Sequence, residues 1–175
     1  LADYWDSLTN NEMMSVDQRI TRLHSVINNA RLADEEGWLN SEIDETFDFE
    51  TPAEIINALK QSNSSWAQKT LEVLQKRSPL MLHISLRLIR LGRKMSLADE
   101  LRLERTLVQH CFYTHHLDRT GAATDTVEGI RALVIDKDNS PRWNPTRIDE
   151  VTQQMVDPFF KSPWAGKSHP LADLK

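Results

Sequence analysis

The sequence predicts an all-α fold. Helix start and stop signals recur along most of the 175 residues, and no segment shows the sustained alternation of apolar and polar residues that marks a half-buried strand. The chain is long enough, with 39% hydrophobic residues, to bury a core of its own. We expect a single helical domain over residues 1–175, built of about seven to nine short helices. Linking helices fill residues 1–50, a helical array fills residues 51–162, and a tail follows in residues 163–175.

The first helix signals are capping motifs. Ser15 and Gln18 predict a capping box at the start of "SVDQRITRLHSVINNA". The acidic stretch over residues 31–49 predicts one or two short helices. Thr51, Pro52 and Glu54 supply an N-cap, a first-turn proline and a carboxylate at the third helical position for the next helix.

The same device recurs further along the chain. Ser78 and Pro79 open the segment "LMLHISLRLIRLG", which Gly92 can end as a left-handed cap. Ser96 with Asp99 then opens a long helix that we expect to run through "HHL", residues 115–117. Asn63–Ser65 and residues 118–123 are expected linkers between helices.

The stretch "TVEGIRALVIDKDNSPRWNP" is the most distinctive part of the sequence. Asp125 with Glu128 predicts a helix start here. The neighbouring Val134 and Ile135 favour a strand, but the capping pattern and Ala132 favour a helix, which we expect. A final helix is expected to begin after Asn144-Pro145 and to end or bend at Pro158.

Composition restricts the function classes. A net charge of −5 argues against a general nucleic-acid binder, and no apolar run reaches membrane-spanning length. The single cysteine, Cys111, excludes an internal disulfide framework and fits a reducing compartment, a bacterial cytoplasm or a mitochondrial matrix. Because the chain opens with "LADYWDSLTN" and no methionine, we expect a fragment.

Common catalytic motifs are missing. The five glycines, at positions 37, 92, 121, 129 and 166, form no phosphate-binding loop, and there is no Gly-x-Ser-x-Gly nucleophile motif. Cys111 and His115 would share a helical face as zinc ligands do, with His110 and His116 nearby, but no second pair of ligands has suitable spacing. A buried thiol beside partly solvated histidines is the favoured interpretation, and we expect no metal site.

Charged side chains suggest one local anion site. His83, Arg87, Arg90 and Lys94 recur at steps of four, three and four, which places them on one face of a helix as a basic stripe. This stripe could hold the phosphates of a nucleotide-tailed ligand, or it could be a solvated face. Acidic groups such as Asp44 with Glu45, or Asp99 with Glu100 and Glu104, are interpreted as caps and surface charges. The residues alone therefore predict no catalytic constellation.

Several segments, taken together, resemble one protein family. "EGIRALVIDKDNSPRWNP" resembles the C-terminal signature of the 3-hydroxyisobutyryl-CoA hydrolase branch of the crotonase (enoyl-CoA hydratase/isomerase) superfamily. "WAQKTLEVLQKRSP", "SPLMLHISLRLIRLGRKMSLADELRLERTLVQHC" and "IDEVTQQMVDPFF" are similar to its neighbouring segments in the same order. The likeness covers roughly residues 49–160. Two departures are Asp125-Thr126-Val127, where the family has Asp-Phe, and the longer loop "HHLDRTGAAT".

The resemblance implies a division of labour within a longer polypeptide. Crotonase-type enzymes bind an acyl-CoA thioester on an N-terminal α/β core, where two backbone N–H groups polarise the thioester carbonyl and core carboxylates act on the acyl group. This chain would be the helical C-terminal domain of such an enzyme, without that core, and it would pack over the core and help to enclose the coenzyme A. Its expected partners are the core and acyl-CoA, with no nucleic acid and no membrane. The CoA thioester would be the substrate, with no further cofactor.

Roles for individual residues follow from the resemblance. Lys137 would contact the CoA phosphates, with Arg87, Arg90 and Lys94 of the basic stripe behind it. Gly129 would permit a close approach, and Ile130, Leu133 and Val134 would pack toward the core or the acyl end. Trp143 would fix the turn that follows.

Three functions remain open from the sequence. The favoured one is hydrolysis of a short acyl-CoA in valine breakdown, as in 3-hydroxyisobutyryl-CoA hydrolase. The second is enoyl-CoA hydration or isomerisation on the same scaffold. The third is a non-catalytic helical interaction module, because fold does not fix function. If the apolar side that faces the core were exposed, homo-oligomer formation would be one way to cover it.

Overall fold

The structure is a computed structural model that describes residues 15, 17–18, 20–21, 41–164 and 168–174. The chain divides into two compact units, residues 1–44 and residues 45–175. In the first unit, the Ser15–Gln18 capping box is confirmed: the Gln18 amide lies 3.2 Å from Ser15 Oγ, and the Ser15 amide lies 2.9 Å from Gln18 Oε1. Most of the linking helices expected in residues 1–50 lie outside the described residues.

The described helices confirm the all-α prediction for most of residues 41–164. Their bounds are α3 (Ser41–Phe47), α4 (Pro52–Gln61), α5 (Ser65–Gln75), α6 (Pro79–Gly92), α7 (Leu97–Phe112), α8 (Asp125–Ile130) and α9 (Gln153–Val156). A π-helix, η3 (Arg131–Ile135), continues α8 directly. Short 3₁₀ helices are η1 (His115–Leu117), η2 (Gly121–Ala123), η4 (Ile148–Glu150) and η5 (Asp157–Phe160).

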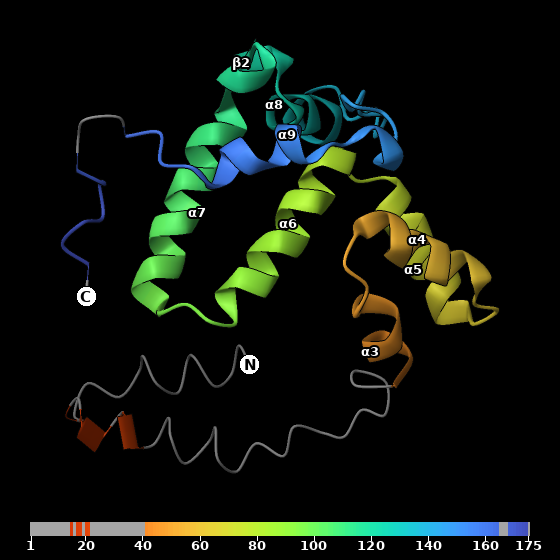
Figure 1. Ribbon diagram of the computed structural model, residues 1–175, viewed down its shortest axis with the longest axis horizontal. Coiled ribbons are helices and arrows are strands. Elements are labelled where there is room, and N and C mark those ends of the chain that lie inside the picture. Colours follow the sequence, from red (N-terminus) through yellow and green to blue (C-terminus); the bar gives the residue numbers. More distant parts are fainter. Residues whose placement is uncertain (1–14, 16, 19, 22–40, 165–167, 175) are drawn as a thin grey trace. The chain divides into compact units, whose positions relative to one another are not determined.

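Two apolar clusters hold the second unit together. Leu80 and Ile84 of α6 pack with Leu107 of α7 and with Val156 and Phe159 of the closing segment, which consists of α9 and η5. In Figure 1, α6 and α7 are joined by a short turn and α9 runs across this pair. The second cluster joins α4 to α5, with Leu86 of α6 packed against it. Because α6 contributes to both clusters, its ends have fixed surroundings.

Local capping signals predicted several helix starts correctly. Thr51 caps α4 in a full capping box with Glu54, Ser78 caps α6 by accepting the Met81 amide, and Ser96 caps α7 by accepting the Asp99 amide. The segment "RALVI" is helical and not a strand, as expected, although it adopts a π-turn closed by a 2.8 Å bond from the Asp136 amide to the Arg131 carbonyl.

Gly92 does not end α6 in the left-handed conformation that the sequence predicted. It is the last residue of α6, its φ is not positive, and two turn bonds, Lys94 N to Leu91 O and Met95 N to Gly92 O, lead the chain into α7. A Cβ at this position would lie 3.1 Å from Glu100 Oε1. Close packing against the next helix therefore explains this glycine.

The expected long helix through residues 115–117 is also wrong. Helix α7 ends at Phe112, and a small antiparallel hairpin follows, with β1 (Tyr113–Thr114) paired to β2 (Arg119–Thr120). Thr114 Oγ1 donates to the His110 carbonyl at 2.8 Å, and Asp118 makes the turn with a φ of 54°. The side chain thereby satisfies one of the last helical carbonyls, which lets the chain leave the helix.

The segment after Pro145 is not one helix. It consists of η4, the four-residue α9 and η5, with Thr152 in an extended conformation as the N-cap of α9. The Thr152 side chain accepts the Met155 amide and so restarts the helix in the middle of the segment.

Candidate functional site

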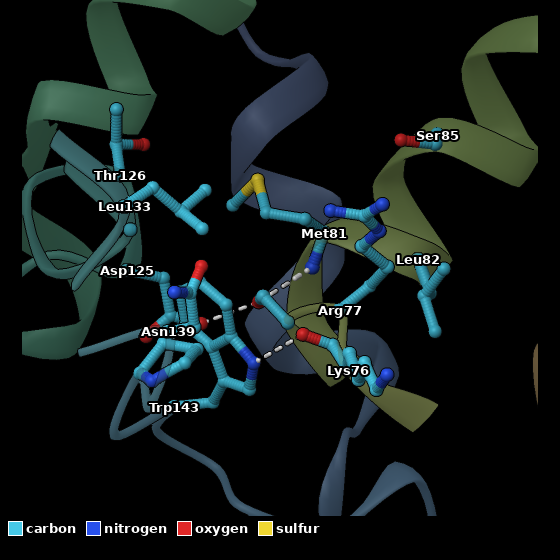
Figure 2. Close-up of a pocket in the computed structure, with 13 residues that line it drawn as sticks. Lys76, Arg77, Met81, Leu82, Ser85, Asp125, Thr126, Leu133, Asn139 and Trp143 are labelled. Carbon is cyan, nitrogen blue, oxygen red and sulfur yellow. Dashed lines mark hydrogen bonds between the residues drawn. The ribbon is translucent and has the colours of Figure 1, made fainter. Parts of the chain in front are cut away.

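A cleft of about 700 Å³ lies where the start of α6 meets α8 and the loop after η3 (Figure 2). Basic, hydroxyl and amide groups share its walls with apolar side chains. The lining residues are Lys76, Arg77, Ser78, Met81, Leu82, Ser85, Asp125, Thr126, Gly129, Leu133, Asn139, Pro141 and Trp143. Both its size and its mixture of apolar walls with a few polar groups are typical of a small-molecule site.

The basic end of the cleft is the junction of two helices. Lys76 is the C-cap of α5, and Ser78 is the N-cap of α6, so Arg77 lies in the short turn between them. The indole N–H of Trp143 donates to the Lys76 carbonyl at 3.1 Å. This bond confirms that Trp143 fixes its turn, and it ties that turn to the basic end of the cleft.

Asp125 is buried at the floor of the cleft. Its carboxylate accepts hydrogen bonds from the Ser78 hydroxyl and, at 3.0 Å, from the Asn144 amide. Burial raises the pKa of Asp125 above its ordinary value, although both hydrogen bonds act in the opposite direction. Asp125 therefore joins α6, α8 and the Asn144 turn, and its oxygens already have partners.

The helix start at Asp125 was predicted one residue too late. Thr124 is the N-cap of α8 and accepts the Val127 amide, whereas the predicted cap, Asp125, is bound to Ser78, 47 positions earlier in the sequence. The predicted partner, Glu128, instead pairs with Arg131. A distant partner for Asp125 and a neighbouring one for Glu128 thus take both residues out of the expected capping box.

Gly129 permits a close approach, as predicted, but here the approaching group is Trp143. A Cβ on Gly129 would lie 3.2 Å from the Trp143 ring. Any larger residue would push the indole away from the wall of the cleft, because α8 and the tryptophan are in direct contact.

Arg131 holds together the loop that follows η3, residues 136–140. Its guanidinium forms two bonds to Glu128, at 2.8 and 2.9 Å, and one 2.7 Å bond to each of Asp136 and Asp138. It also donates to the Ser140 carbonyl at 3.1 Å. The guanidinium of Arg131 and the Arg142 amide lower the pKa of Glu128 to about 2. Arg131 therefore forms one ion-pair network with Glu128, Asp136 and Asp138.

This network fixes the backbone around Lys137. Lys137 and Asn139 have positive φ values of 55° and 52°, and the Asn139 amide donates to the Ala132 carbonyl at 3.1 Å. Asn139 lines the cleft, and Lys137, two residues before it, is exposed. Lys137 makes no side-chain hydrogen bond or ion pair within residues 41–164, so its ammonium group is available to a ligand.

The apolar residues expected to pack toward a core are exposed in the described part of the chain. Exposed fractions are 40% for Ile130, 53% for Leu133, 62% for Val134 and 67% for Ile135. We call Ile130, Leu133, Val134 and Ile135 the apolar face of α8–η3. Leu133 also lines the cleft, so anything that covers this face would border the cleft.

The basic stripe lies elsewhere. His83, Arg87 and Arg90 share one side of α6, as predicted, whereas Lys94 lies in the turn after α6 ends at Gly92. All four residues line a second cleft of about 530 Å³, whose lining does not include Asn139. Arg87 pairs with Asp157 at 2.6 Å and lies over the Phe160 ring, and Arg90 pairs with Glu50 at 2.8 Å. Burial lowers the pKa of His83. The two arginines of the stripe are therefore neutralised by carboxylates that are distant in sequence.

The cysteine and histidine cluster forms no metal site among the described residues. Helix α7 ends at Phe112, so Cys111 and His115 do not share a helical face. His110 Nε2 lies 2.8 Å from the Lys161 carbonyl, and His116 Nε2 lies 2.9 Å from the Met155 carbonyl. Burial raises the pKa of the Cys111 thiol, so the thiol stays protonated and unreactive at neutral pH. These contacts attach the end of α7 to the closing segment.

Sequence reasoning missed Lys76, Arg77 and Asp125 as cleft residues. The signal for the first two was the adjacent pair of cations directly before the Ser-Pro helix start, which places both at a helix junction. For Asp125, the signal was a carboxylate inside a cap region that already had a threonine available as the cap.

Known proteins share this segment. The sequence profile of the enoyl-CoA hydratase/isomerase family matches residues 1–160. The chain belongs to this family. It is 41% identical over 119 residues to the mitochondrial 3-hydroxyisobutyryl-CoA hydrolase of Gallus gallus, and 39% identical over 120 residues to that of Homo sapiens. These matches cover 68% and 69% of this chain and 29% of each relative, so the chain spans about three tenths of their length.

Two solved structures agree with this assignment. A carnitinyl-CoA dehydratase from Mycobacterium thermoresistibile matches with a TM-score of 0.57 and 33% identity, over 69% of this chain and 32% of that one. An enoyl-CoA hydratase from Rhodobacter sphaeroides 2.4.1 matches with a TM-score of 0.58 and 28% identity, over 84% and 43%. The likeness supports a crotonase-like fold. None of the described helices has the length and apolar content needed to cross a membrane.

Proposed function

We propose that this chain is the helical part of an acyl-CoA thioester hydrolase that acts on 3-hydroxyisobutyryl-CoA, and that its cleft side closes over the bound coenzyme A. The observation that carries the proposal is the rigid Glu128–Trp143 segment. The Arg131 network holds the Lys137 loop in place, and Gly129 seats Trp143 against α8. The same segment places the apolar face of α8–η3 beside the cleft.

The chemistry would take place on the core of the longer polypeptide. In the hydrolysis, water adds to the thioester carbonyl, the C–S bond breaks, and a free acid and the CoA thiol result. Asp125, the one carboxyl among the described residues that line the cleft, already accepts hydrogen bonds from Ser78 and Asn144. Because both of its oxygens already have partners, it is poorly placed to activate water. The base and the oxyanion-stabilising N–H groups therefore belong to the N-terminal core.

The apolar face of α8–η3 would pack against that core. Four exposed aliphatic side chains in six consecutive positions are more than a solvated helix needs, and their burial would be strongly favourable. Contact there would also enclose the cleft at Leu133. Since several relatives with this segment are named as mitochondrial, the mitochondrial matrix is the proposed location, with a bacterial cytoplasm as the alternative.

Lys137 would bind the phosphates of coenzyme A. Changing Lys137→Ala in the full-length protein should raise KM for acyl-CoA by up to about tenfold with little change in kcat, because binding is lost equally from the ground state and the transition state. The matched substrate is the acyl-pantetheine thioester, which lacks the nucleotide phosphates and whose KM should not change. An equal rise for both thioesters would remove Lys137 from the phosphate site.

Hydration of an enoyl-CoA is a second candidate, favoured by the names of the two similar solved structures. Two assays of the full-length protein distinguish the hydrolase from the hydratase. One measures free CoA thiol released from 3-hydroxyisobutyryl-CoA, and the other measures loss of the double bond of an enoyl-CoA. Thiol release without hydration supports the hydrolase. Hydration without thiol release would replace it with the second candidate.

A further inference from the structure

The cations in and around the two clefts differ in whether they already have partners. In the described part of the chain, the guanidinium groups of Arg87, Arg90 and Arg131 are bound to carboxylates. The side chains of Lys76 and Arg77 make no hydrogen bond or ion pair there, and both line the 700 Å³ cleft. The sequence pattern favours the basic stripe as the anion site, but both arginines of the stripe are paired with carboxylates, whereas both cations of the 700 Å³ cleft are available.

The position of this pair is fixed by the fold. Lys76 and Arg77 occupy the two residues between α5 and the Ser78 cap of α6. The Lys76 carbonyl is held by the Trp143 indole, and Ser78 is held by Asp125. The backbone at this end of the cleft is thus anchored on both sides, so a ligand would find the two side chains already presented at one place.

The rest of the lining indicates what the ligand carries beside its negative charge. Met81, Leu82 and Leu133 supply apolar surface, and Trp143 and Pro141 supply a flat wall, as Figure 2 shows in part. Asn139 and Ser85 add neutral polar groups. An arginine binds phosphate oxygens in a bidentate manner, and a flat apolar wall suits a heteroaromatic ring. A phosphorylated nucleoside combines both features.

We propose that Arg77 and Lys76 bind the phosphates at the nucleotide end of the acyl-CoA substrate, with Trp143 as the wall beside that nucleotide. This inference rests on the proposed function and assigns a ligand group to a part of the cleft that the basic stripe does not reach. The loop that carries Lys137 borders the same cleft through Asn139.

The test compares thioesters with and without the nucleotide. In the full-length protein, Arg77→Gln should raise KM for acyl-CoA by about tenfold, since it removes a charge-assisted bond, and should leave kcat and the KM for the acyl-pantetheine thioester unchanged. Arg77→Lys should recover part of the affinity. The matched control is Arg93→Gln, which removes the same charge from the exposed C-cap of α6, lines neither cleft and should change nothing.

Binding of fragments separates this inference from the proposed function. By calorimetry, Arg77→Gln should weaken binding of adenosine 3′,5′-bisphosphate about tenfold whether or not the protein hydrolyses any thioester. Unchanged affinity for the bisphosphate would overturn the inference. The inference would also be overturned if Arg77→Gln weakened inhibition by the free hydroxy acid and left bisphosphate binding unchanged. The cleft would then hold the carboxylate of the product.

Discussion

At the scale of single residues, Asp125 shows how one buried carboxyl organises the cleft. It joins the cap of α6 to the start of α8 and to the Asn144 turn. Because burial raises its pKa, the folded protein binds its proton more tightly than the unfolded chain does. The stability linked to this group is fully present below the unfolded pKa and is lost as the pH rises through the folded pKa.

Asp125→Asn should remove this pH dependence. The variant keeps an acceptor for the Asn144 amide. As the pH rises above the ordinary carboxyl pKa, its free energy of unfolding should therefore rise relative to that of the native protein. Asp125→Ala should lose about 1–3 kcal/mol, because the Ser78 hydroxyl and the Asn144 amide lose their partner in a buried place. Urea denaturation across the acidic and neutral range measures both. A difference between the Asp125→Asn variant and the native protein that stays constant with pH would contradict the account of Asp125.

The roles of Gly129 and Trp143 depend on the direct contact between these two residues. The indole lies where a Cβ on Gly129 would point, and its N–H is bound to the Lys76 carbonyl. The glycine of the signature is therefore explained by a neighbour 14 positions along the chain. The sequence predicted that another group would approach Gly129 closely, but it did not indicate which group.

At the scale of elements, the Arg131 network turns the end of η3 into a rigid loop. Glu128 has a pKa of about 2, lowered from 4.5 chiefly by Arg131, so the stabilisation from this ion pair is present above about pH 4.5 and is lost as the pH falls toward 2. The loop that carries Lys137 owes its two positive φ residues to the same arginine, which bonds to both flanking aspartates.

Arg131→Met should therefore have two effects in the full-length protein. The difference in unfolding free energy between native protein and variant should shrink as the pH falls below about 4.5, because native Glu128 then takes up a proton as well. KM for acyl-CoA should also rise, with the KM for acyl-pantetheine unchanged, because Lys137 is no longer held in place. A variant with native KM values for both thioesters would show that the loop geometry does not depend on Arg131.

Elements differ in how far sequence predicted them. Starts of α4, α6 and α7 were predicted correctly because a serine or threonine cap and its amide partner lie within three residues of each other. The end of α6 was predicted at the right residue, but Gly92 does not adopt the expected left-handed conformation. The end of α7 was missed because the Thr114 hydroxyl takes up a helical carbonyl. The basic stripe was correct as a pattern, but its ion pairs with Glu50 and Asp157 join residues 40 and 70 positions apart.

At the scale of the whole molecule, the apolar face of α8–η3 is the surface that most needs a partner. Val134→Lys in the full-length protein should lower the unfolding free energy by about 2 kcal/mol, since a charge would replace an aliphatic group buried against the core. The matched control is Val73→Lys on α5, where the valine is 50% exposed and no partner is proposed. Equal small effects of the two substitutions would mean that the face stays in solvent.

We propose that the cleft side of this chain closes over coenzyme A. The most direct measurement is hydrogen–deuterium exchange of the full-length protein with and without saturating coenzyme A. Slower amide exchange in both residues 76–82 and residues 130–140 is the result that the structure predicts. Unchanged exchange in both segments, with protection confined to other parts of the protein, would contradict it.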